Sequence, residues 1–180
     1  MANSKRKDSK GGPYVPLKIK LDDPRIEDKV SAIFKSVDDI EYYREVMLSV
    51  PLGKPVWSYW VTSRYGTRSD PFKKTKARHK GVDLASRTGN KVNVKGQGKV
   101  IRAEYAGAYG NLVVVDHGNG FQTKYAHLNK IYVKKGDRLE INDTVGEVGS
   151  TGRSTGPHLH YEVLYKGVNV DPLPFLKAKI

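Results

Sequence analysis

The chain has 180 residues, of which 28% are charged, and its formal net charge is +13. This length suits one domain with a hydrophobic core and a small appendage, and nothing in the sequence indicates two full domains. Because the chain contains no cysteine, disulfides, thiolate nucleophiles and thiolate metal ligands are excluded.

The positive charge favours an anionic partner, either nucleic acid, an anionic envelope surface or a wall polymer with free carboxylates, although a basic surface also serves solubility alone. The sequence has no RRM, KH, helix-turn-helix or zinc-finger signature. Both tryptophans lie together at Trp57 and Trp60, not on a spaced platform for stacking bases. We therefore expect no nucleic-acid partner, while an anionic envelope surface stays an alternative.

The first 50 residues are expected to form an appendage. Residues 1–22 are rich in Lys, with Gly and Pro interleaved, which is typical of a basic flexible tail or linker. Residues 23–50 predict a helical segment, because Asp23 suits the N-cap, Pro24 the first turn, and apolar residues recur at helical spacing. We expect a helical hairpin or bent helix packed on a domain; the alternative is a lid or partner-docking segment.

Residues 51–180 predict one mainly β domain with a twisted antiparallel sheet. Short β-rich runs are separated by glycines, and a further strand pair is expected between Ile131 and Val148. The segment Asp116–Gly120 contains Asn-Gly and predicts a hairpin turn that includes His117, which we interpret as a turn residue and not a ligand. The other expected strands are 91–94, 98–105, 111–116 and 122–127.

Four histidines and one aspartate form the candidate site. His158 and His160 are two apart in a strand-like run and share a face, and an offset of four also places His79 and Asp83 on one face of a strand. His127 lies on another expected strand. One aspartate and two histidines, with a fourth position left for water, are typical of a catalytic zinc site, but spacing alone does not say which histidine of the second pair is the ligand.

The three motifs H-x-x-x-D, Tyr-Ala-His-Leu and Thr-Gly-x-Ser-Thr-Gly-Pro-His-Leu-His resemble those of the LytM/lysostaphin-type zinc endopeptidases. Members of that family cut peptide cross-links of bacterial cell walls, and the resemblance runs from about residue 61 to 176. It implies a lysostaphin/LytM-like fold. It also implies that His79, Asp83 and His160 hold Zn²⁺ and that His127 and His158 are the catalytic pair.

The sequence has no H-E-x-x-H motif to supply a glutamate base, so an imidazole with a pKa of about 6.5 is the expected proton acceptor. His158 and His127 would divide that work, one accepting the proton and the other stabilising the intermediate. Near the metal we expect a substrate groove. Its candidate residues are Arg153, Ser154, Thr155, Tyr65, Tyr109 and Asn111.

The resemblance implies a peptidoglycan hydrolase of the bacterial cell envelope that acts on stem peptides or cross-bridges. We expect a D,D-endopeptidase of the periplasm. The alternative is a non-hydrolytic LytM-type binding module that activates cell-wall amidases. Residues 1–22 lack the apolar stretch of a signal peptide, so we expect the signal or membrane anchor on a longer native chain.

Overall fold

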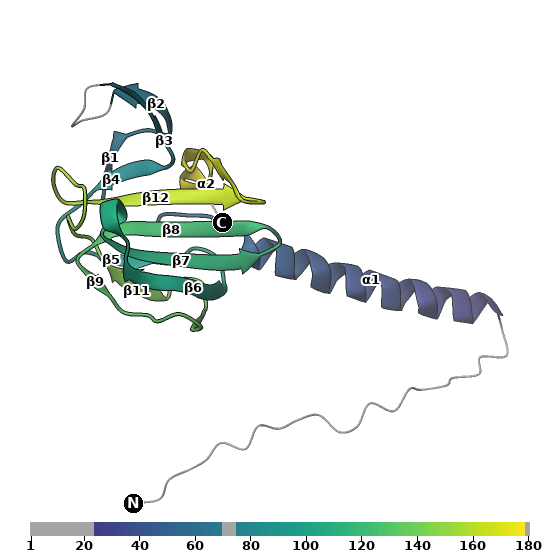
Figure 1. Ribbon diagram of the computed structural model, residues 1–180. Coiled ribbons are helices and arrows are strands. Elements are labelled where there is room, and N and C mark those ends of the chain that lie inside the picture. Colours follow the sequence, from purple (N-terminus) through teal and green to yellow (C-terminus); the bar gives the residue numbers. More distant parts are fainter. Residues whose placement is uncertain (1–23, 70–74, 179–180) are drawn as a thin grey trace, which may run out of the picture. The chain divides into compact units, whose positions relative to one another are not determined.

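The computed structural model describes residues 24–69 and 75–178. The basic tail expected at residues 1–22 lies outside these residues. By its internal contacts the chain divides into residues 1–40 and 41–180. Helix α1 (Pro24–Ser49) is a single uninterrupted helix, not a hairpin (Figure 1). Among the described helices, none is long and apolar enough to cross a membrane.

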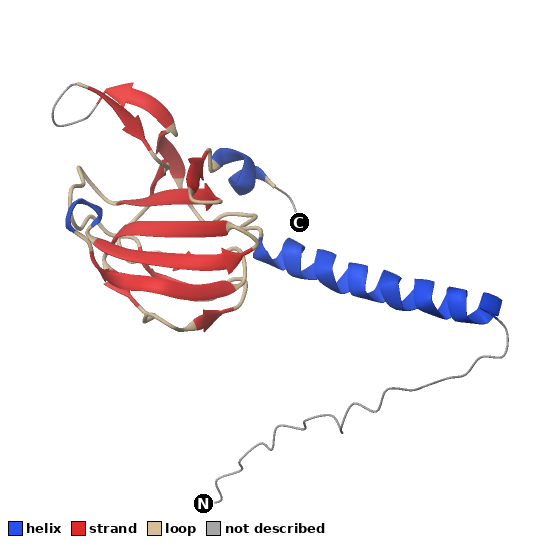
Figure 2. Ribbon diagram, turned by 45° about the vertical axis from the view of Figure 1, so that its right-hand side comes forward, coloured by secondary structure: helices blue, strands red, loops and turns tan. Residues whose placement is uncertain are grey.

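Residues 41–180 are built around an antiparallel sheet of eight strands, seven of them in the order β1-β4-β12-β8-β7-β6-β10, with β13 paired to β12 (Figures 1 and 2). The prediction of a mainly β, antiparallel fold is confirmed. The bounds of these strands are Trp60–Ser63 (β1), Val82–Ala85 (β4), Gly98–Tyr105 (β6), Asn111–Gly118 (β7), Phe121–Leu128 (β8), Arg138–Leu139 (β10), His158–Tyr165 (β12) and Val168–Val170 (β13).

Two smaller sheets complete the domain. One has the order β5-β11-β9, and the other is the hairpin of β2 and β3. Their bounds are Lys91–Asn93 (β5), Thr144–Glu147 (β11), Lys130–Ile131 (β9), Gly66–Ser69 (β2) and Lys76–His79 (β3). The strand pair expected between Ile131 and Val148 is thus three short strands. A short 3₁₀ helix, η1 (Gly107–Tyr109), and helix α2 (Leu173–Lys177) lie outside the sheets.

The main hydrophobic core lies on one face of the large sheet, and the opposite face carries polar side chains beside a smaller buried cluster of Leu112, Val114 and Ala126. β-Branched and aromatic residues alternate inward along the long strands, and they form one buried cluster with valines of the β5-β11-β9 sheet. Representative members are Val92, Val113, Val145, Tyr125 and Tyr161. Burial of this face fixes the strand register, because a slip of one residue would turn every inward side chain outward.

His117 is a correction to the sequence analysis. It lies within β7 and is buried, with Nδ1 donating to the Gln97 carbonyl at 2.8 Å and Nε2 lying 2.8 Å from the Thr123 hydroxyl. The turn itself comes one residue later, where Gly118, Asn119 and Gly120 all have positive φ. Strand β7 continues through His117, so the prediction of a turn residue was wrong.

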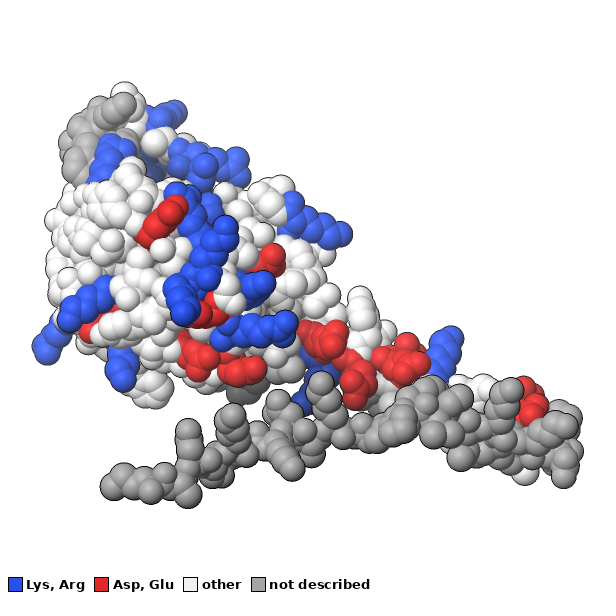
Figure 3. Space-filling model, turned by 60° about the horizontal axis from the view of Figure 1, so that its bottom comes forward, with Lys and Arg blue, Asp and Glu red and all other residues white. Residues whose placement is uncertain are grey.

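The surface of the sheet domain carries many Lys and Arg side chains (Figure 3). In the view of Figure 3, Lys and Arg side chains lie side by side over the middle of the face, with Asp and Glu side chains around them. The basic character is therefore not confined to the N-terminal residues.

Candidate metal centre and cavity

Three strands bring the predicted ligands together. Asp83 in β4 is the register partner of His160 in β12, and His79 ends β3. The expectation that His79 and Asp83 share one strand face is wrong, because Lys80 and Gly81 separate two different strands. The turn packs tightly on β12: a Cβ added to Gly81 would lie 2.9 Å from the Tyr161 carbonyl carbon.

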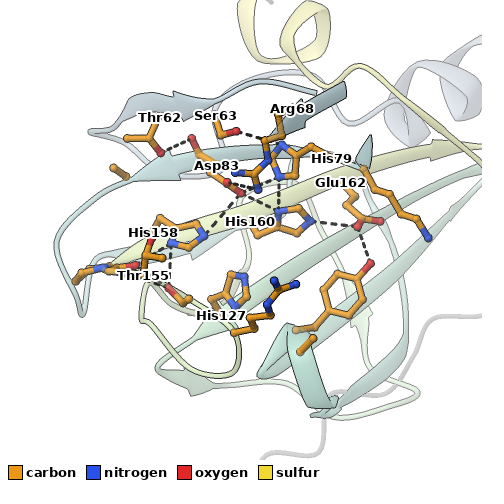
Figure 4. Close-up of a pocket in the computed structure, with 18 of the residues that line it drawn as sticks. Thr62, Ser63, Arg68, His79, Asp83, His127, Thr155, His158, His160 and Glu162 are labelled. Carbon is orange, nitrogen blue, oxygen red and sulfur yellow. Dashed lines mark hydrogen bonds and ion pairs between the residues drawn. The ribbon is translucent and has the colours of Figure 1, made fainter. Parts of the chain in front are cut away.

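The three side chains converge at one point (Figure 4). His79 Nε2 lies 3.1 Å from Asp83 Oδ1 and 3.1 Å from His160 Nδ1, and His160 Nδ1 lies 2.8 Å from Asp83 Oδ1. All three residues are less than 10% exposed. Two imidazole nitrogens and one carboxylate oxygen, buried and mutually this close, are a donor set suited to a metal ion.

Hydrogen bonds on the far side of each ring fix which nitrogen faces this point. His79 Nδ1 donates to the Arg64 carbonyl at 2.8 Å, and His160 Nε2 donates to the Glu162 carboxylate at 3.1 Å. In the neutral rings the lone pairs of His79 Nε2 and His160 Nδ1 are therefore directed at the Asp83 oxygen. Three converging lone pairs repel one another unless a cation lies among them, so the residues present fit a metal.

The pKa values of the ligands also favour a cation at this point. Burial raises the pKa of Asp83, but the adjacent imidazoles of His160 and His79, when they carry positive charge, outweigh burial and hold this pKa well below its usual range. Burial lowers the pKa of His160, but hydrogen bonds to Asp83 and Glu162 outweigh it, so the net shift is upward. Asp83 and His160 are thus stabilised together by one positive charge, carried by a proton or a metal ion.

His127 and His158 stand beside the three ligands, with ring centroids 4.8 Å apart. Nδ1 of His127 donates to the Thr151 carbonyl at 2.7 Å, and Nδ1 of His158 donates to the Gly156 carbonyl at 2.8 Å. Each neutral ring therefore carries an unprotonated Nε2, and that of His158 lies 3.7 Å from Asp83 Oδ1. Both imidazoles are oriented to accept a proton next to the ligand cluster.

The backbone and pKa of His127 are both unusual. Its φ of 61° lies in the left-handed region, which non-glycine residues rarely adopt and which costs about 1–3 kcal/mol. Burial lowers its pKa to about 4, opposed by the hydrogen bond to Thr151 and assisted by His158 and His160. His127 is therefore a neutral ring at physiological pH.

A cavity of about 520 Å³ contains these five residues. Among the predicted groove residues, Arg153, Ser154, Thr155 and Tyr109 line it. Tyr65 and Asn111 are not among the described lining residues. The Tyr65 hydroxyl donates to the Asn169 carbonyl at 2.7 Å, and the Asn111 amide donates to the backbone carbonyls of the β8–β9 connection.

Further charged residues lie beside the ligand cluster and line the cavity. Arg68 Nη2 lies 3.3 Å from Asp83 Oδ2, while Arg78 and Lys80 line the cavity. Glu162 follows His160 by two residues, a spacing that places both side chains on the polar face of β12. No local signal identifies Arg68, which comes from a separate hairpin.

Comparisons with known proteins place the chain among peptidases. The profile of peptidase family M23 matches residues 77–172. The chain is 41% identical over 128 residues to peptidoglycan DD-endopeptidase ShyA of Vibrio cholerae, covering 70% of this chain and 29% of that protein. The chain thus spans less than a third of this relative.

Two solved structures have the same fold. A zinc-containing peptidase from Vibrio cholerae superposes with a TM-score of 0.61 at 36% identity, covering 73% of this chain and 40% of that one. The catalytic domain of the antimicrobial peptidase lysostaphin from Staphylococcus simulans gives a TM-score of 0.61 at 31% identity, covering 67% and 93%. The match to lysostaphin covers nearly the whole of that domain.

Proposed function

Because the chain belongs to peptidase family M23, we propose that it is a zinc-dependent endopeptidase that hydrolyses peptide cross-links of bacterial peptidoglycan. The observation that carries this proposal is the combination of three converging ligand atoms with two imidazoles that present an unprotonated Nε2 to the same cavity. His79, Asp83 and His160 are the proposed zinc ligands. A zinc ion held there would supply Lewis acidity, which polarises the scissile carbonyl and makes water a better nucleophile.

His158 is the proposed proton acceptor. Its Nε2 lies beside the ligand cluster, and its Nδ1–H is held by the Gly156 carbonyl, so the ring can take the proton of the attacking water and become an imidazolium. The Ser154 hydroxyl, 3.2 Å from the same Nδ1, supports this orientation. The imidazolium can then pass the proton to the leaving amine.

His127 is proposed to act on the intermediate. Its low pKa makes it a poor resting acid, but negative charge that develops on the substrate oxygen favours uptake of a proton from solvent at its Nε2, which can then donate to that oxygen. The bond between its Nδ1 and the Thr151 carbonyl keeps its Nε2 directed into the cavity. The two histidines thus divide proton acceptance and charge stabilisation.

The proposed substrate is the peptide part of peptidoglycan, and the proposed reaction is that of a D,D-endopeptidase. The support is the similarity to a relative named a peptidoglycan DD-endopeptidase, together with a cavity lined by Arg68, Arg78, Lys80 and Arg153, which suits anionic stem peptides. A non-hydrolytic activator of amidases is not favoured, because all five proposed ligand and catalytic side chains converge.

We further propose that residues 51–180 form the peptidase domain, that residues 1–22 are a linker, and that the protein works in the bacterial cell envelope, in the periplasm. The support for the location is the nature of the proposed substrate, which lies outside the cytoplasmic membrane.

The test is release of muropeptides from purified sacculi by the zinc-loaded chain, with bound zinc quantified. We expect loss of cross-linked dimers, and no loss with a chelator or with His158→Ala. One bound zinc without any cleavage would contradict the proposal. The masses of the released peptides identify the bond, so products of glycine-bridge cleavage alone would overturn the D,D assignment.

A further inference from the structure

Glu162 is a buried carboxylate at the floor of the cavity. It lies in β12, two residues after His160, and its side chain is 0% exposed. Burying a carboxylate costs several kcal/mol unless hydrogen bonds and opposite charge offset the loss of water. The Glu162 carboxylate therefore needs hydrogen-bond donors or a cation close to it.

Four donors from different elements saturate the two carboxylate oxygens. Oε1 accepts from His160 Nε2 at 3.1 Å and from the Tyr109 hydroxyl at 2.8 Å. Oε2 accepts from Asn169 Nδ2 at 2.9 Å and pairs with Lys124 Nζ at 3.0 Å. The four donors hold the carboxylate in one orientation, and it is not placed to accept the proton of an attacking water.

We propose that Glu162 is a positioning residue that sets the metal-binding nitrogen of His160, an inference that rests on the proposed zinc site. By accepting the Nε2–H of His160, the carboxylate keeps the proton off Nδ1. The lone pair of Nδ1 is then directed toward Asp83 Oδ1 and His79 Nε2 (Figure 4). A negative acceptor behind the ring also increases the basicity of the ligating nitrogen.

The neighbours of Glu162 restrict it to this role. Lys124 and Asn169 hold Oε2 away from His160, and the Tyr109 hydroxyl holds Oε1. Glu162 is thus prevented from rotating toward the ligand cluster as a fourth protein ligand. The coordination position needed for water and substrate stays available.

The first experiment compares zinc affinity of Glu162→Gln and the native chain by competition with a chromophoric chelator. The amide keeps the shape but removes the charge, and its NH₂ group opposes the Lys124 and Asn169 donors. Loss of such an outer carboxylate weakens metal affinity by about 10–100-fold. Glu147→Gln, in β11 and outside the cavity, is the matched control and should change affinity less than about twofold.

Thermal unfolding verifies that both variants are folded. A folded Glu162→Gln with native zinc affinity would overturn the inference. A second measurement requires no variant: long-range ¹H–¹⁵N correlation spectra of the zinc-loaded native chain should place the remaining ring proton of His160 on Nε2. A proton on Nδ1 would overturn the inference, as would failure of the native chain to bind zinc. Zinc binding without cleavage of sacculi would contradict only the proposed peptidase activity.

Discussion

Substitution of Gly81 by alanine should separate two strands that carry metal ligands. The added Cβ would lie 2.9 Å from the Tyr161 carbonyl carbon and closer still to its oxygen, whereas carbon atoms in contact lie about 3.5–4.0 Å apart. The turn between His79 and Asp83 must therefore move from β12 by about 0.6 Å or more. Metal–ligand distances tolerate only about 0.2 Å, so zinc affinity should fall at least tenfold.

The same overpacking should lower the free energy of unfolding by about 1–3 kcal/mol. Chelator competition measures the zinc affinity and urea unfolding measures the stability. Gly156→Ala is the matched control, because a Cβ added there meets nothing within 4 Å. If Gly81→Ala keeps native zinc affinity and native stability, the close contact between this turn and β12 does not position the ligands.

The remaining predictions concern the histidines and the metal. His160→Ala should lose zinc, whereas His158→Ala should keep it and lose about 10²–10⁴-fold in turnover; equal zinc loss in both would contradict the assigned roles. Free zinc at 100 times its Kd should raise the free energy of unfolding by about 2.7 kcal/mol in the native chain, and a similar gain in His160→Ala would argue against the site. Burial lowers the pKa of His117, although hydrogen bonds to Gln97 and Gly96 oppose this shift. The neutral His117 ring therefore contributes its full stabilisation of the fold above about pH 6.5, and this contribution is lost as the pH falls. In urea unfolding with chelator present, the stability gap between the native chain and His117→Gln should therefore narrow from pH 7.5 to 5.5, and a constant gap would contradict this.

The fold class follows from local patterns that the structure retains. Alternating runs separated by glycines predict the long strands, and Asn119-Gly120 predicts the turn between β7 and β8. The spacing between His79 and Asp83 does not predict the local structure correctly. A spacing of four indicates one face of one strand, but the chain turns at Gly81, and the two side chains meet because β12 approaches that turn closely.

Other features of the site arise from contacts between distant residues. The left-handed backbone of His127 has no sequence signal, because only Gly, Asn and Asp commonly indicate that conformation. The Tyr65 hydroxyl is directed to the carbonyl of Asn169, 104 residues away, and no local pattern predicts that pairing. Glu162 is different, since its spacing from His160 contained the relevant information and only its interaction partners were missing.

The pairing of β4 with β12 has a consequence for folding kinetics. Asp83 and His160 are 77 residues apart, and the hairpin of β7 and β8 lies between them in the chain, with β8 as the other neighbour of β12. Such non-local pairing is slow, because loop closure must precede the contacts that stabilise it. The full ligand set should therefore form only at the end of folding, so that zinc slows unfolding while leaving the refolding rate unchanged.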